Sequence, residues 1–193
     1  MSVASTMLEL GTKAPDFNLP DVTTGKSISL SRFSGQKALL VMFICQHCPY
    51  VKHIQNELAL VGKDYIPKDV GIIGISSNDV QNYPNDSPSH LKTMVSDLKL
   101  NFPVCYDETQ EAAKAYRAAC TPEFYLFDKD RKLVYRGQLD ESRPKNDLPV
   151  SGKDLRGALD CLLSNKPISP IQKPGIGCNI KWKPGNEPDY FSK

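Results

Sequence analysis

Two cysteines separated by two residues, Cys45 and Cys48, directly follow an apolar run at positions 38–44. A run of this length is typical of a buried strand. The residues that come next predict a helix, so the dithiol lies where that helix begins. Unpaired N–H groups and the positive end of the helix dipole stabilise a thiolate there. A spacing of two residues also lets a disulfide close with little backbone movement. The pattern therefore predicts a reversible dithiol, with the Cys45 thiol titrating below the free-cysteine value of about 8.5.

The elements around the dithiol form a strand–helix–strand unit. One face of the predicted helix carries apolar residues spaced by three and four: Val51, Ile54, Leu58 and Val61. Pro49 fits that helix only in its first turn, where a missing N–H costs nothing. A second apolar run at 70–76 completes a βαβ unit, which requires the two strands to be parallel.

The remaining pattern predicts one α/β domain over residues 1–165 and a tail over 166–193. Residues 77–89 predict a loop. Further strands are expected at 27–30, 102–106, 124–128 and 132–136, and further helices around 91–98, 112–116 and 155–163. Ser151 is expected to cap the last helix. The tail holds five prolines and no periodicity, so we expect it to be irregular and to pack on or near the domain.

The composition excludes several classes of protein. A length of 193 residues, 40% hydrophobic residues and 24% charged residues are typical of a single globular domain. A net charge of +2 without a basic block gives no reason to expect a nucleic-acid partner. The apolar runs are far shorter than the roughly 18 residues of a spanning helix, so no membrane association is expected. The first ten residues show no signal-peptide pattern, and six cysteines are too sparse for a disulfide-stapled secreted scaffold. Reduced cysteines in the cytoplasm are therefore expected.

A CxxC pair beside a βαβ unit is typical of a thioredoxin-like redox site. The alternative is half of a zinc site, with Cys45 and Cys48 joined by His53 or Cys178. No second CxxC and no HxxxH completes a familiar zinc spacing. Haem attachment is excluded because Pro49 stands where that motif requires histidine.

Several further segments carry a family resemblance. The strand–CxxC–helix unit, followed by Thr121-Pro122 before an apolar strand, resembles the thioredoxin superfamily. The N-terminal segment around Pro15-Asp16-Phe17 is similar to the peroxiredoxin branch. The segments at 45–53, 136–140 and 177–182 resemble a peroxiredoxin-like group of the AhpC/TSA (redoxin) type, over roughly residues 8–184. The resemblance implies a thioredoxin fold: a central mixed β-sheet flanked by helices, with an N-terminal peroxiredoxin-like extension.

The resemblance also implies roles for single residues. Cys45 aligns with the exposed attacking thiol and Cys48 with the resolving thiol. Pro122 aligns with a cis-proline that faces the disulfide, and Thr121 precedes it. Of the supporting residues, His47 between the cysteines could stabilise the thiolate.

The other four cysteines fall into two pairs. Cys120, beside the Thr-Pro loop, is expected to approach the dithiol as a third redox thiol or a metal ligand. Cys178 is expected to fold back over the site as an extra resolving thiol. Cys105 and Cys161 stand in apolar patterns and are interpreted as core residues.

These observations favour a cytoplasmic thiol–disulfide oxidoreductase with an antioxidant or redox-homeostasis role. It would need no cofactor and no metal. Its partners would be protein or low-molecular-weight disulfides and thiols, and an external reductant such as a thioredoxin or glutathione system. One alternative is a thiol peroxidase acting through a Cys45 sulfenic acid. Peroxiredoxins carry a threonine three residues before the attacking cysteine, but Met42 stands there. A zinc-binding interaction module is the second alternative.

Overall fold

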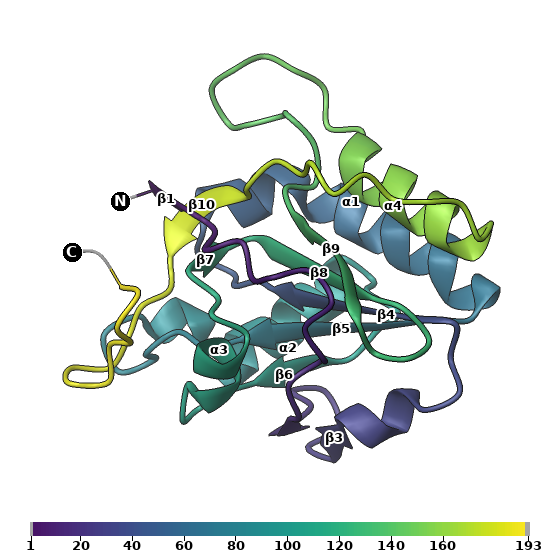
Figure 1. Ribbon diagram of the computed structural model, residues 1–193. Helices are drawn as coiled ribbons and strands as arrows, with labels where there is room; N and C mark the ends of the chain where they lie inside the picture. The colour runs from purple at the N-terminus through teal and green to yellow at the C-terminus, as the bar shows by residue number, and fades with distance from the viewer. Residues whose placement is uncertain (1, 192–193) are drawn as a thin grey trace.

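The computed structural model describes residues 2–191 (Figure 1). The strands are β1 (Ser2–Ala4), β2 (Asn18–Pro20), β3 (Ser27–Ser29), β4 (Ala38–Phe43), β5 (Val70–Ser76), β6 (Val104–Tyr106), β7 (Cys120–Thr121), β8 (Glu123–Phe127), β9 (Leu133–Gly137) and β10 (Ile176–Asn179). The helices are α1 (Pro49–Tyr65), α2 (Pro88–Asp97), α3 (Glu111–Ala115) and α4 (Lys153–Leu163), with the 3₁₀ turns η1 (Leu30–Phe33), η2 (Ile66–Lys68) and η3 (Pro84–Asp86).

A five-stranded mixed sheet in the order β6-β5-β4-β8-β9 forms the centre of the fold. Strands β4, β5 and β6 are parallel, whereas β8 and β9 run antiparallel to their neighbours. The parallel pairing of β4 with β5 confirms the predicted βαβ unit. Because β4 is the middle strand and is covered on both sides, each of its six residues is buried. The continuous apolar run before the dithiol is thus required by the position of the strand.

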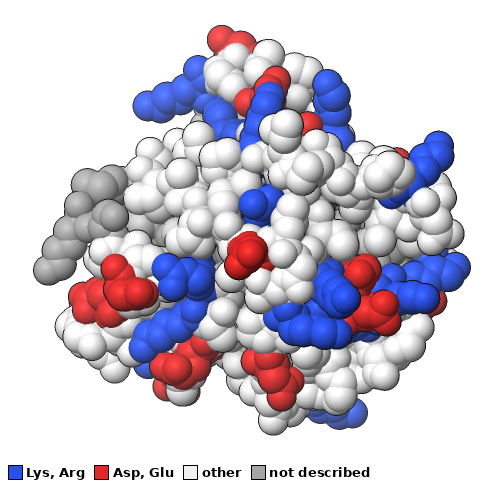
Figure 2. All heavy atoms as spheres, viewed as in Figure 1, with Lys and Arg blue, Asp and Glu red and all other residues white. Residues whose placement is uncertain are grey.

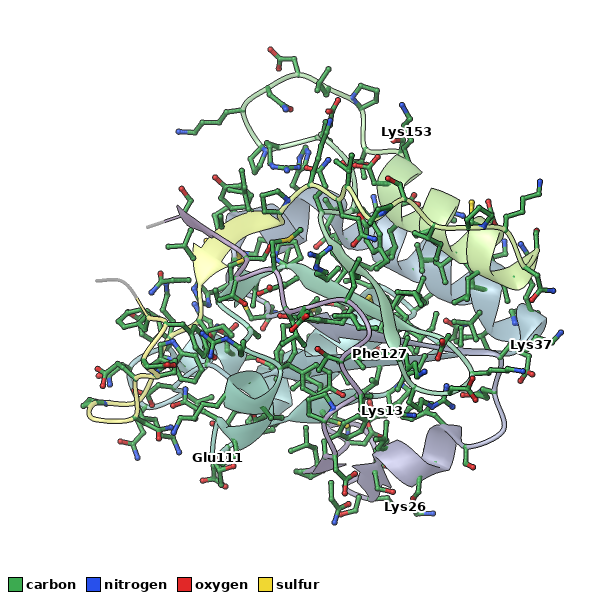
Figure 3. The ribbon with its side chains drawn as sticks, viewed as in Figure 1. Lys13, Lys26, Lys37, Glu111, Phe127 and Lys153 are labelled. Atoms are coloured by element: carbon green, nitrogen blue, oxygen red, sulfur yellow. The ribbon has the colours of Figure 1, made fainter. Side chains whose placement is uncertain are left out.

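The two faces of the sheet carry separate apolar clusters. Leu40 and Met42 of β4 face a cluster that includes the apolar sides of α1, α2 and α4. Leu39, Val41 and Phe43 face the other cluster, which is covered by α3, the N-terminal segment and part of the tail. Figure 1 shows α1 and α4 side by side over one side of the sheet, where Arg156 pairs with Glu57 at 2.5 Å. Figure 3 places Phe127 among the central strands and Lys26, Lys37 and Lys153 at the periphery.

Two local predictions are wrong. Ser151 is not the N-cap of α4, because Gly152 occupies that position in the left-handed region at φ 65°. Both residues donate backbone N–H groups to Asp140 Oδ2 at 2.7 Å, which fixes the approach to the helix. The segment 77–89 is also more ordered than a loop, since it contains η3 and the first residues of α2.

The tail forms a strand, contrary to the expectation that it is irregular. Strand β10 pairs antiparallel with β1 on one side and with β7 on the other, so that Cys178 lies opposite Thr121. Figure 1 shows β1 and β10 together near the start of α1. Ile180 and Trp182, which follow β10, are buried against the domain. A four-residue strand next to prolines is too short to show a periodicity, and its partners β1 and β7 are distant in the sequence.

The surface is mixed in charge. On the face shown in Figure 2, basic and acidic side chains are interspersed and no extended field of one sign forms. None of the helices between residues 2 and 191 combines the length and apolar character needed to cross a bilayer.

Gly177 is expected to be essential for the pairing of β10. A Cβ atom at this position would lie 2.1 Å from the carbonyl oxygen of Thr121, which is backbone and cannot turn away. Gly177→Ala should therefore lower the free energy of unfolding by about 1–3 kcal/mol. Gly157→Ala is the matched control, because a Cβ in that helical position meets nothing within 4 Å. The control should gain about 0.5–1 kcal/mol from helix propensity. Urea unfolding of both variants measures the difference, and equal stabilities would contradict the proposed packing.

Candidate active site

The dithiol lies in the connection between β4 and α1. Cys48 is the N-cap of α1, with extended backbone, and Pro49 is the first helical residue. Both cysteines are 0% exposed. The Cys45 Sγ atom lies 3.3 Å from Thr121 Oγ1, and the Cys48 thiol donates to the carbonyl oxygen of Thr121 at 3.1 Å. The Thr121–Pro122 peptide bond is cis, as the resemblance implies. The structure thus brings together the four residues that sequence reasoning placed at the centre of the site.

A third thiol lies against this pair. Cys178 of β10 lies opposite Thr121 in register and packs against the apolar cluster that contains Cys45 and Cys48. The ionisation of Cys48 is affected by both other thiols, which places Cys48 between Cys45 and Cys178. Cys178 is half-buried, whereas the other two are buried. The tail does fold back over the site, as expected for Cys178.

The predicted order of ionisation is reversed in the structure. The pKa of Cys48 is lowered by hydrogen bonds from Cys178 and Cys45 to the Cys48 thiolate, and these bonds outweigh the effect of burial. When Cys48 ionises, it loses the hydrogen bond that its thiol donates to the Thr121 carbonyl oxygen. The bond with Cys48, burial and the nearby Asp86 carboxylate raise the pKa of Cys45. The start of α1 acts in the same direction but contributes less, since the backbone N–H group of Val51 in its first turn also stabilises the Cys48 thiolate.

Asp86 of η3 is the residue of the site that sequence reasoning missed. Its buried carboxylate accepts the backbone N–H groups of Gln46 at 2.9 Å and His47 at 3.0 Å. It also accepts Asn78 Nδ2 at 2.7 Å and pairs with His47 Nδ1. Burial opposes ionisation, but these hydrogen bonds outweigh it and lower the pKa of Asp86. An Asp in a polar segment, some 40 residues from the motif, gives no periodic signal that could have revealed it.

The predicted supporting histidine is held by this carboxylate. His47 stacks on the ring of Tyr83, with 5.6 Å between the centroids, and its Nδ1 atom lies 3.9 Å from Cys45 Sγ. The potential ligand atoms of Cys45, His47 and Asp86 all lie within 4.8 Å of one another. Sulfur, imidazole and carboxylate ligands suit Zn²⁺. His53, which the zinc alternative considered, is not part of this cluster, since it bonds to Ser142 Oγ at 2.7 Å.

Cys120 faces away from the dithiol. It neighbours Thr121 in β7, so its side chain points to the opposite side of the strand. Its thiol contacts the carbonyl oxygen of Pro122 at 3.9 Å and Glu123 Oε2 at 3.8 Å, and burial raises its pKa. Cys120 is near enough to the redox pair for the charge of Cys48 to raise its pKa further, so its expected approach to the dithiol stays a prediction. Cys105 is a core residue as predicted, whereas Cys161 is half-buried in α4.

Glu123 fixes the loop that faces the dithiol. This carboxylate is 1% exposed and accepts the backbone N–H groups of Ala119 at 2.8 Å and Cys120 at 3.2 Å. Its second oxygen accepts the hydroxyl of Tyr125 at 2.8 Å. Burial outweighs these hydrogen bonds and raises the pKa of Glu123 to about 7. An acidic residue inside an apolar strand pattern was the available signal, and the sequence interpretation passed over it.

Comparison with known proteins agrees with this geometry. Residues 10–136 match the AhpC/TSA family. The thiol-disulfide oxidoreductase ResA of Bacillus thuringiensis is 30% identical over 129 residues, which cover 66% of this chain and 68% of that protein.

Solved structures extend the comparison to the whole chain. An uncharacterized conserved protein from Geobacillus kaustophilus superposes with a TM-score of 0.94 at 52% identity, covering 96% of this chain and 98% of its own. The thioredoxin domain of a thiol-disulfide oxidoreductase from Bacteroides vulgatus superposes with a TM-score of 0.57 at 23% identity, covering 70% and 90% of the two chains. The predicted thioredoxin fold is therefore confirmed.

Glu123 should make the stability of the protein depend on pH. Its pKa is about 7 in the folded chain, against the usual 4.5 of a glutamate, so only the folded state keeps the proton between these values. The contribution of Glu123 to stability is then greatest below pH 4.5 and is lost as pH rises through 7, by on the order of 3 kcal/mol. Glu123→Gln cannot ionise and should remove this fall.

The measurement is urea unfolding at several pH values from 5 to 8, with the exposed Glu9→Gln as control. The difference in stability between wild type and Glu123→Gln should change with pH, and that between wild type and Glu9→Gln should not. A pH-independent difference for Glu123→Gln would contradict the assigned ionisation.

Proposed function

The chain belongs to the AhpC/TSA family, and we propose that it is a thiol–disulfide oxidoreductase whose redox pair is Cys45 and Cys48. One observation carries the proposal: the two thiols lie at the start of α1, and both are in hydrogen-bond contact with Thr121 of the cis Thr121–Pro122 bond. Similarity to ResA supports the reaction class. No group beyond the thiols is required, because thiol–disulfide exchange transfers two electrons between sulfur atoms.

The reaction proceeds through a mixed disulfide. A thiolate of the pair attacks a sulfur of the substrate disulfide, and one substrate thiol leaves. The second thiol of the pair then displaces the other substrate thiol and closes the Cys45–Cys48 disulfide. The lowered pKa of Cys48 makes it the thiolate of the resting reduced site. This favours Cys48 as the first nucleophile inside the site and Cys45 as the thiol that closes the disulfide, the reverse of the predicted roles.

The proposal extends to the substrates and the reductant of the protein. We propose protein or low-molecular-weight disulfides as substrates and a thioredoxin or glutathione system as reductant, in a redox-homeostasis role in the cytoplasm. A recess beside Pro122 supports the docking of a substrate. It is lined by Tyr50, His53, Arg143 and Ile176, among others, and Ile176 is 41% exposed.

A thiol peroxidase is the second candidate, and one contact favours it. The hydroxyl of Thr121 in β7 lies 3.3 Å from Cys45 Sγ. It could take the place of the peroxiredoxin threonine hydroxyl that is missing from the stretch before Cys45. In this reaction a peroxide would oxidise Cys45 to a sulfenic acid, and Cys48 would condense with it to a disulfide and water. The cluster of Cys45, His47 and Asp86 similarly keeps the zinc-binding alternative open to test.

Serine replacement of either Cys45 or Cys48 should abolish catalysed exchange. The assay follows the reduction of a protein disulfide by dithiothreitol, and the loss should be at least about a hundredfold because the Cys45–Cys48 disulfide can no longer form. Cys161→Ser, a half-buried thiol in α4, is the matched control and should keep the wild-type rate.

Two further measurements separate the candidates. Consumption of hydrogen peroxide that is fast in wild type and lost in Cys45→Ser, without disulfide exchange, would replace the proposal with a peroxidase. Stoichiometric zinc in anaerobically purified protein, again without exchange, would replace it with a metal-binding module.

A further inference from the structure

The redox pair has no direct route to solvent. Cys45 and Cys48 are each 0% exposed, so an external disulfide cannot reach either sulfur in this conformation. Cys178 packs against the cluster that contains both cysteines, lies opposite Thr121 in register and is half-buried. Within residues 2–191, it is the one thiol that both contacts the pair and reaches the surface.

The position of Cys178 is built into the fold. Its strand, β10, is held between β1 and β7, and Cys178 lies opposite Thr121 in register. Thr121 itself contacts both sulfurs of the pair. The neighbouring Gly177 allows β10 to approach the Thr121 carbonyl more closely than any residue with a Cβ atom could. Three segments distant in sequence therefore converge to place one extra thiol beside Cys48.

From this arrangement we infer that Cys178 is the thiol that exchanges with external disulfides, and that it passes electrons between them and the buried Cys45–Cys48 pair. The inference rests on the proposed function and moves the attack on the external disulfide from the buried pair to Cys178. It also defines the substrate class as disulfides that can approach β10 at the surface, because the buried pair need not be exposed during turnover.

The relay consists of three exchange steps. First, Cys178 gives its proton to the Cys48 thiolate and attacks the external disulfide RSSR′, so that R′S⁻ leaves and takes that proton from Cys48. Next, the Cys48 thiolate attacks Cys178 Sγ, forms a Cys48–Cys178 disulfide and releases RS⁻. Finally, Cys45 gives its proton to RS⁻ and attacks Cys48, so that Cys178 leaves as a thiolate and takes a proton from water. Cys45 and Cys48 have lost two electrons, and the external disulfide has become two thiols.

Two variants test the relay with oxidised glutathione as the probe. In Cys45→Ser the last step is impossible, so oxidation should accumulate a Cys48–Cys178 disulfide, identified by mass spectrometry of linked peptides. In Cys178→Ser the buried pair loses the half-buried thiol that connects it to the surface. Formation of the Cys45–Cys48 disulfide should then slow by on the order of tenfold or more, since exchange depends on access to the attacked sulfur. Cys161→Ser provides the matched control, because it removes a half-buried thiol outside the cluster.

The outcomes separate the relay from the proposed function. If wild type forms no Cys45–Cys48 disulfide, the proposed function itself fails, and the relay fails with it. If wild type forms the disulfide, a wild-type rate in Cys178→Ser overturns the relay alone. Absence of the Cys48–Cys178 linkage in oxidised Cys45→Ser overturns it equally, and this readout does not depend on how well Cys178→Ser folds.

Discussion

The buried carboxylate of Asp86 is the constraint on which the geometry of the dithiol depends. It accepts two consecutive backbone N–H groups, those of Gln46 and His47, and it pairs with the His47 ring. These bonds fix the turn between β4 and α1. Without the carboxylate, two partly buried donors would lose their partner, at a cost of up to about 1–3 kcal/mol each. This turn leads directly into α1, which starts at Pro49 and has Cys48 as its N-cap.

The opposite wall of the site is fixed by a second buried carboxylate. Glu123 holds the backbone of Ala119 and Cys120 from one side of β7, while β10 pairs with β7 at its edge. Thr121 is therefore held between the buried Glu123 and strand β10 of the C-terminal tail. Its hydroxyl and carbonyl groups contact Cys45 and Cys48, respectively. Each carboxylate thus positions a segment of backbone, and the two segments meet at the sulfur atoms.

The sequence was sufficient for the parts of the fold that periodicity and local chemistry determine. The predicted strand at 70–76 coincides with β5, and the apolar face of α1 is buried as its spacing indicates. The predictions that failed concern elements that depend on contacts between distant segments. Strand β10 exists because β1 and β7 pair with it. Asp86 matters only because η3 returns to the motif. The ionisation of the two cysteines likewise depends on Cys178 and Asp86, which distant segments bring to the motif.

The ionisation of the pair is the central claim, since it determines which sulfur of the buried site acts as the nucleophile. The most direct measurement is the rate of alkylation of each cysteine in the reduced full chain as a function of pH, resolved by mass spectrometry of peptides. The midpoint for Cys48 should lie below the value of a free thiol, about 8.5, and that for Cys45 above it. A lower midpoint for Cys45 than for Cys48 would contradict the account.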